Sequence, residues 1–283
     1  MTSSTLPPND AAPTTNRTQG LKPTVFWRIA EDIPQSLNWV LICLSIIVPF
    51  VTWWLISGLP NVNSAFLPSP TDVVSAFQRL WEKGFLLEDT LASFIRVGVG
   101  FLIAAVLSIP FGILMGTFAS FAAMLEPIVG IVRYMPAPAF TPLLIIYLGL
   151  DEAPKITLIV LGTLFYNILM IMDAVKFVPK DLIEATYTLG GNRFQVLLRV
   201  IMPYVVPNII DTFRINIATS WNMVIVAELV AAESGLGKRI ELAQKFFRTD
   251  EIFACLIILG VIGFTLDLIF RAILRLSCKW AIE

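Results

Sequence analysis

Residues 180–203 read KDLIEATYTLGGNRFQVLLRVIMP, a mixed polar and apolar stretch that lies between long hydrophobic runs. Pro179 before Lys180 and Asp181 predicts the start of a helix, because proline is tolerated in a first turn and an acidic side chain is favourable there. The pair Gly190-Gly191 predicts the end of that helix, and Asn192 begins a second helix that runs into Pro203. The stretch therefore predicts a short helix, a tight turn and a second helix.

The chain around this stretch has the composition of a membrane protein. Hydrophobic residues make up 57% of it and charged residues only 14%, whereas about 25% of residues are charged in an ordinary soluble domain. Six apolar runs are long enough to cross a hydrocarbon core of ~30 Å. They are residues 37–56, 91–116, 121–148, 156–175, 203–229 and 252–274. We expect an all-α, polytopic membrane protein with about six transmembrane helices.

Two of these runs contain features that predict their packing. Gly112 and Gly116, four residues apart in the second run, could let a neighbouring helix approach closely. Pro136, Pro138 and Pro142 in the third run must kink or break its helix at mid-depth, because each proline leaves a backbone carbonyl unpaired.

The domain organisation follows from the same pattern. Residues 1–35 are rich in Pro, Thr, Ser and Asn and are expected to form a disordered cytoplasmic tail, and residues 36–278 form the transmembrane domain. The first apolar run begins too late for a cleavable signal peptide. Lys and Arg are more numerous in the tail, in residues 176–202 and at the C-terminus than in the opposite loops, which predicts cytoplasmic termini. Residues 70–83 and 234–248 then form external helices.

Several classes of site and partner are disfavoured. The chain has no histidine and three scattered cysteines, so zinc sites, structural disulfides and a membrane-embedded enzyme are not expected. A net charge of −1 without a basic block argues against nucleic acid as a partner. We predict no cofactor and no metal.

Glu184-Ala185, Gly190 and the later Val200, Met202 and Pro203 have a spacing that resembles the EAA loop of permease subunits in bacterial ABC importers. Thr186, Val200 and Met202 depart from that pattern by residues of similar size. Other segments resemble the nitrate, sulfonate, taurine and bicarbonate branch of these permeases. These segments are FLPSP at 66–70, RYMP at 133–136 and TDEIFA at 249–254.

This resemblance implies the type I ABC importer permease fold in the bacterial inner membrane. It implies a homodimer of permease subunits as the pathway, cytoplasmic ATPase subunits as the energy source and an external solute-binding protein, which the external helices could dock. The phosphate-binding sequence G-x-x-x-x-G-K-[ST] is absent, so this chain is not expected to bind ATP.

The resemblance assigns ATPase coupling to residues 178–203. The expected residues are Glu184, Ala185, Gly190, Gly191, Asn192 and Pro203. Glu184 would anchor the helix pair and Ala185 would allow close packing. The alternative is an amphipathic helix that only lies on the membrane surface.

Polar residues in the apolar runs are the candidates for a solute pathway. Asn208, Thr212, Asn216, Thr219 and Ser220 form one stripe at helical spacing, with Arg214 beside it near Asp211. Arg133 precedes the proline break, where it could bind an anion. The alternatives are hydrogen bonding between helices for the stripe, and pairing with Glu126 or Asp173 for Arg133.

The expected solute is a small oxyanion such as nitrate, bicarbonate, a sulfonate or taurine. A heterocyclic vitamin precursor is an alternative within the same architecture. An ion-coupled secondary transporter is an alternative of another class, although no inverted repeat is visible in the sequence.

Overall fold

The computed structural model describes residues 33–281, and every regular element in that range is helical. The longer helices are α1 (Gln35–Ser57), α3 (Phe85–Thr117), α4 (Ala119–Tyr134), α6 (Glu152–Lys176), α9 (Met202–Ala231) and α11 (Thr249–Ser277). The shorter ones are α2 (Pro70–Glu82), η2 (Ala137–Phe140), α5 (Thr141–Leu148), α7 (Lys180–Thr188), α8 (Arg193–Val196), η3 (Leu197–Ile201), α10 (Leu236–Lys245) and η4 (Lys279–Ala281). The predicted tail 1–35 lies outside the described residues, apart from its last three positions.

Within residues 33–281, five helical segments are long and apolar enough to cross a membrane, and a bent pair of helices could form a sixth. The five correspond to α1, α3, α6, the continuous segment Arg193–Val230 and α11. Each contains one of the predicted apolar runs. The all-α prediction is confirmed. The second span is longer than predicted, because α3 already begins at Phe85.

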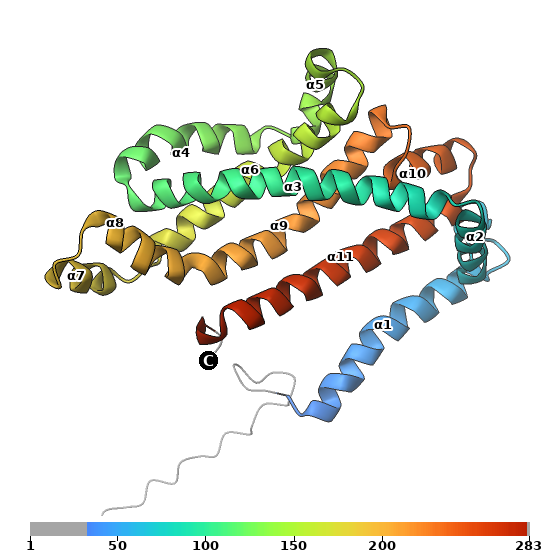
Figure 1. Cartoon of the computed structure of the whole chain (residues 1–283). Coiled ribbons are helices and arrows are strands. Elements are labelled where there is room, and N and C mark those ends of the chain that lie inside the picture. Colours follow the sequence, from blue (N-terminus) through green and yellow to red (C-terminus); the bar gives the residue numbers. More distant parts are fainter. Residues whose placement is uncertain (1–32, 282–283) are drawn as a thin grey trace, which may run out of the picture. The chain divides into compact units, whose positions relative to one another are not determined.

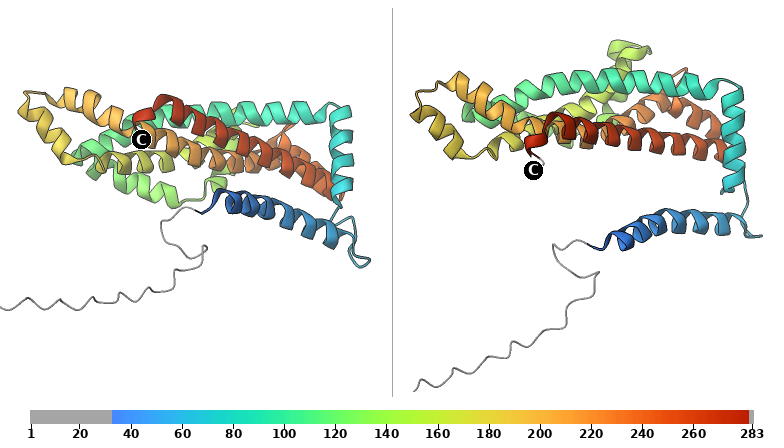
Figure 2. Two further views of the ribbon diagram at one scale, coloured as in Figure 1. Left: turned by 90° about the horizontal axis from the view of Figure 1, so that it is seen from below. Right: turned by 60° about the horizontal axis from the view of Figure 1, so that its bottom comes forward.

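Helix α3 packs closely against α6, and α9 and α11 lie alongside them (Figures 1 and 2). The close approach depends on glycine. A Cβ atom at Gly112 would lie 2.7 Å from the Ile171 side chain, and one at Gly116 would lie 2.5 Å from that of Val175. Gly100 meets Ile159 in the same way at 2.8 Å. The predicted role of the small residues at 112 and 116 is therefore confirmed, and their partner is α6.

The third predicted span is broken, as its prolines predict. Helices α4 and η2–α5 meet at an angle of 86°. Pro136 lies at the break, Pro138 lies in η2, and Pro142 lies in the first turn of α5, where its missing N–H costs little.

The two ends of this bundle carry short helices (Figure 1). At one end, called the α10 end, α10 packs on α3, α9 and α11, and α2 packs on α3 and α11. At the other, the α7 end, α7 and α8 connect α6 to α9. The predicted external helix 234–248 is shorter in the structure, because Gly235 (φ 127°) precedes α10 and Phe247 (φ 54°) follows it.

Candidate functional site

The turn between α7 and α8 is built from local backbone chemistry. Gly190 has a φ of 81°, and the N–H groups of Gly190 and Gly191 donate to the carbonyls of Tyr187 and Thr186, both at 2.9 Å. This is a Schellman motif, in which glycine supplies the left-handed residue. A Cβ atom at Gly191 would lie 2.7 Å from the Thr186 carbonyl oxygen. Both glycines are therefore required by the geometry.

The second helix of this segment starts with a capping box. Asn192 accepts a hydrogen bond from the Gln195 N–H at 2.9 Å, and the Gln195 side chain accepts one from the Asn192 N–H at 2.9 Å. From Arg193 the chain continues through the π-helical turn η3 into α9, so the segment 193–230 is one helix. Pro203 is exposed and lies in the first turn of α9, so the predicted second helix runs into Pro203 and continues beyond it.

Helix α7 is exposed over most of its surface, and in it only Ile183 and Thr186 are half-buried. Glu184 and Ala185 are exposed, and in residues 33–281 the Glu184 carboxylate makes no hydrogen bond or ion pair. The expected anchoring of the helix pair by Glu184 and the close packing at Ala185 are therefore absent from this structure. The same segment also exposes apolar and aromatic side chains, namely Leu189 at 88% exposure, Leu182, Tyr187 and Phe194. This α7 surface (Leu182, Glu184, Ala185, Tyr187, Leu189 and Phe194) has no partner in the described part of the chain.

The α7 segment is joined to the long helices by a buried core. Val178 and Val196 from the connections pack with Val175 of α6 and Val205 of α9, and Ile183 of α7 packs on this group. Such packing resists deformation, so a displacement of α7 would be passed to α6 and α9 together.

A cavity of about 450 Å³ lies at the break between α4 and α5. Arg133, Pro136, Tyr166, Thr219 and Met223 are among its lining residues, and we call it the Arg133 cavity. The Arg133 guanidinium donates to the Tyr134 hydroxyl at 3.0 Å and lies over that ring. In residues 33–281 neither expected partner pairs with it: Glu126 lies 3.9 Å from the Lys176 ammonium, and no ion pair joins Asp173 to Arg133.

The predicted polar stripe of α9 is divided among three environments. Thr219 lines the Arg133 cavity, and Asn208 is exposed. Thr212, Asn216 and Ser220 are buried, and Asn216 donates to the Asn167 side chain of α6 at 2.7 Å, which is the helix-to-helix bonding considered as the alternative. The Ser220 hydroxyl has no hydrogen-bond partner among the described residues.

Arg214 is held by two carboxylates. It lies 2.8 Å from Asp211 and 3.0 Å from Asp267 of α11. In this structure Arg214 therefore joins α9 to α11, and it does not line the Arg133 cavity.

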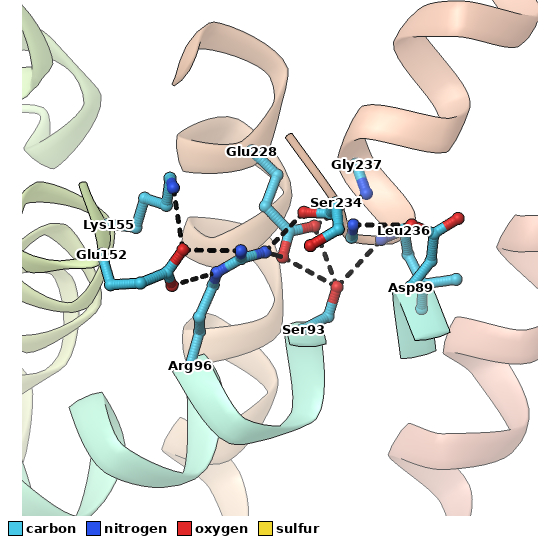
Figure 3. A network of polar contacts seen from close by, with 10 residues as sticks. Asp89, Ser93, Arg96, Glu152, Lys155, Glu228, Ser234, Leu236 and Gly237 are labelled. Atoms are coloured by element: carbon cyan, nitrogen blue, oxygen red, sulfur yellow. Dashed lines mark hydrogen bonds and ion pairs between the residues drawn. The ribbon is translucent and has the colours of Figure 1, made fainter. Parts of the chain in front are cut away.

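A buried ionic network at the α10 end was not predicted from the sequence (Figure 3). Arg96 of α3 pairs with Glu228 of α9 at 2.7 Å and with Glu152 of α6 through two bonds of 2.5 and 2.8 Å. Lys155 donates to Glu152 at 3.0 Å. Ser93 donates to both oxygens of Glu228 at 2.8 and 2.9 Å. The network links three long helices.

The backbone at the start of α10 completes this network (Figure 3). The Gly237 N–H donates to Glu228 at 2.8 Å, and a Cβ atom at Gly235 would lie 2.4 Å from the Glu228 carboxyl carbon. Asp89 accepts from the Gly235 N–H at 2.8 Å and from Arg239 at 2.7 Å. Arg96 and Glu228 stand inside apolar runs, and that position was the signal that could have revealed them.

Three hollows adjoin one another along α9. The Arg96 hollow, of about 720 Å³, is lined by Arg96, Glu152, Lys155 and Val230 among others. Val230 also lines an apolar hollow of about 450 Å³, whose other lining residues include Pro138 and Val226. Pro138 in turn lines the Arg133 cavity.

Comparison with known proteins gives a consistent result. Residues 108–279 match the family described as binding-protein-dependent transport system inner membrane component. The taurine transport system permease TauC of Escherichia coli is 30% identical over 90% of this chain and 92% of its own length. The putative aliphatic sulfonates permease SsuC of Bacillus subtilis is 34% identical over 81% and 83%. The riboflavin permease RibX of Chloroflexus aurantiacus is 28% identical over 87% and 92%.

A solved structure agrees on the fold. A chain of the MetNI methionine ABC transporter, in an inward-facing conformation, aligns with a TM-score of 0.60 at 19% identity. The alignment covers 69% of this chain and 96% of that one.

Proposed function

This chain belongs to the binding-protein-dependent transport system inner membrane components, and from that premise we propose how it takes part in import. It is a multi-pass inner-membrane permease subunit of an ABC transporter and is not itself catalytic. A transporter of this kind works with ATPase subunits and a binding protein. Membership of this family argues against the ion-coupled secondary transporter.

For the coupling step, α7 docks in a cleft of the ATPase subunit. The observation that supports this is the α7 surface, which exposes Leu189 and Glu184 while Ile183 packs on the core below. A group of exposed apolar side chains is typical of a protein contact. Closure of the ATPase pair on ATP would then move α7 and, through the packed core, α6 and α9 as rigid bodies.

For the solute, the proposal is a small organic sulfonate such as taurine. The observation that carries it is the Arg133 cavity, where the guanidinium has no carboxylate partner among residues 33–281 and shares the lining with Thr219 at the break of the third span. A guanidinium matches the oxygens of an anionic group. The named substrates of TauC and SsuC are of this class.

The arrangement in the membrane is proposed as follows. Both termini and α7 face the cytoplasm, and α2 and α10 face outward, where they could receive the binding protein. Residues 36–278 form the permease domain and two copies form the pathway.

Uptake into vesicles that contain the permease, its ATPase partner and its binding protein tests the solute. Taurine or ethanesulfonate should accumulate, and Arg133→Gln should reduce uptake about tenfold or more because the anion loses its countercharge. The riboflavin permease RibX makes a heterocyclic vitamin the second candidate. Uptake of riboflavin in place of the sulfonates would reject the first proposal in favour of the second.

A further inference from the structure

Two buried cations at the α10 end share one exchangeable carboxylate. We propose that Arg96 and Lys155 form an anion-binding site in the Arg96 hollow, that the chain's own Glu152 occupies it at rest, and that the sulfonate of a small organic anion replaces Glu152. The choice of a sulfonate as the ligand rests on the proposed function, to which this site adds a binding place. It would be the place where the anion first meets the permease.

The two cations are buried and both of them bind the Glu152 carboxylate. Arg96 is 4% exposed and Lys155 is 5% exposed, although charged side chains are rarely so buried unless paired. Among the described residues, the Lys155 ammonium contacts only Glu152, at 3.0 Å. Arg96 uses Nε and Nη2 for Glu152, the two-pronged geometry that also suits a sulfonate. Without Glu152, all three of these nitrogens would face the hollow.

The two carboxylates on Arg96 differ in freedom. Glu228 is completely buried and accepts further hydrogen bonds from Ser93 and from the Gly237 N–H. The Glu152 side chain is 54% exposed and lies at the first residue of α6. In the described chain its partners are Arg96 and Lys155 only. Glu152 can therefore turn away while Glu228 keeps Arg96 in position.

Charge decides which ligand fits. Among the described residues, the carboxylates that contact the two cations are those of Glu152 and Glu228, while Asp151 and Glu233 line the hollow without contacting them. When Glu152 leaves, Lys155 and two nitrogens of Arg96 lose their carboxylate, and the sulfonate of the ligand takes its place. Val230 lines both the Arg96 hollow and the neighbouring apolar hollow. The apolar hollow could therefore receive the organic part of the ligand. A small monovalent organic anion satisfies both requirements.

The test is direct binding of ethanesulfonate to the full-length chain in phosphatidylcholine nanodiscs, measured by calorimetry without ATPase or binding protein. Glu152→Gln removes the competing charge, so the variant should bind ethanesulfonate about tenfold or more tightly than the wild type. Glu233→Gln is the matched control, because Glu233 is exposed, lines the same hollow and contacts neither cation. It should change the affinity by less than about threefold.

Four further measurements locate the effect. Adding Lys155→Gln to Glu152→Gln should cancel the gain, and the uncharged isostere ethanesulfonamide should bind all variants equally. Should Glu152→Gln fail to fold, Lys155→Gln alone is compared with the wild type, and it should bind ethanesulfonate about tenfold more weakly. Replacing part of the phosphatidylcholine with anionic phosphatidylglycerol should leave the gain intact.

The proposal is overturned if folded Glu152→Gln binds no more tightly than Glu233→Gln, if the double variant keeps the gain, or if Lys155→Gln alone binds as the wild type does. If the tighter binding of ethanesulfonate by Glu152→Gln disappears in nanodiscs that contain phosphatidylglycerol, the site binds a lipid headgroup. That result would also overturn the proposal. The binding experiment does not depend on transport. A failure of sulfonate uptake in vesicles would therefore reject the proposed function without deciding whether the Arg96 hollow binds ethanesulfonate.

Discussion

Gly190 and Gly191 meet different requirements of one turn. Gly190 needs a left-handed backbone, with a φ of 81°, and has open space around it. Gly191 has an ordinary backbone but no room, because Thr186 lies where a side chain would be. The sequence predicted this turn because its chemistry is local. It could not predict that Glu184 would be exposed, since that depends on what surrounds the helix.

Gly190→Val should nearly abolish ATP-driven uptake while the chain still inserts in the membrane. A left-handed residue that is not glycine costs about 1–2 kcal/mol, and more when it is β-branched, so the turn would rearrange. Gly190→Asn is the matched control, because asparagine tolerates this conformation. It should retain most of the uptake measured in vesicles. Equal uptake by both variants would contradict this account of the turn.

The Arg96–Glu228 pair joins residues that are far apart in the sequence, and no spacing rule connects them. Arg96 is the one charged residue of its apolar run, whereas the run that contains Glu228 also contains Asp211 and Arg214. The contact arises because α3 and α9 meet beside Gly235 and Gly237 at the start of α10.

Glu228→Gln should lower the free energy of unfolding by about 3–5 kcal/mol, because it leaves the buried Arg96 without its fixed countercharge. The measurement is denaturant unfolding in detergent. Glu233→Gln, an exposed neighbour, should change stability by less than about 0.5 kcal/mol. Equal stability of the two variants would show that the buried pair contributes little.

At the scale of elements, the apolar runs predicted where the spans are but not their ends or partners. A run of hydrophobic residues identifies a span by its length alone. Helix α3, however, also includes the polar residues Glu88 and Asp89, which precede its apolar run. Asp89 accepts hydrogen bonds from Arg239 and from the Gly235 N–H. That extension depends on α10, which the pattern of α3 does not contain.

The packing of α3 on α6 can be tested by substituting two glycines of α3, one that contacts α6 and one that does not. Gly112→Ala should destabilise the folded chain by about 1–3 kcal/mol, because the new methyl would lie 2.7 Å from Ile171 and 2.9 Å from the Ile168 carbonyl oxygen. Gly98→Ala has open space and should be neutral or slightly stabilising, because alanine favours a helix. Thermal unfolding measures both. The same loss at both positions would contradict the assigned α3–α6 contact.

Helix α2 begins with a capping box that depends on pH. Hydrogen bonds from the Ser69 side chain and N–H lower the pKa of Asp72. Because the folded state favours the carboxylate, the box stabilises α2 above the ordinary pKa of aspartate. This stability is lost as the pH falls through the lowered pKa.

Ser69→Ala should therefore cost about 1 kcal/mol at neutral pH and much less in acid. Hydrogen exchange at the Asp72 and Val73 amides measures this. Ser75→Ala is the control, since Ser75 donates only to the Thr71 carbonyl within the helix. A Ser69→Ala effect that is independent of pH would reject the role of the Asp72 charge.

At the scale of the whole molecule, the proposed orientation places α7 inside and α10 outside. In spheroplasts of a Cys43→Ser strain, an impermeant maleimide should label Lys245→Cys at once and Lys180→Cys only after lysis, since both positions are exposed. The reverse pattern would invert the topology.

The central claim is that this permease moves its solute only when a partner hydrolyses ATP. The most direct measurement is uptake into vesicles of the solute carried by its binding protein. The account predicts accumulation when permease, ATPase, binding protein and Mg-ATP are all present, and none when the ATPase is omitted. Uptake by the permease alone, driven by an ion gradient, would contradict it.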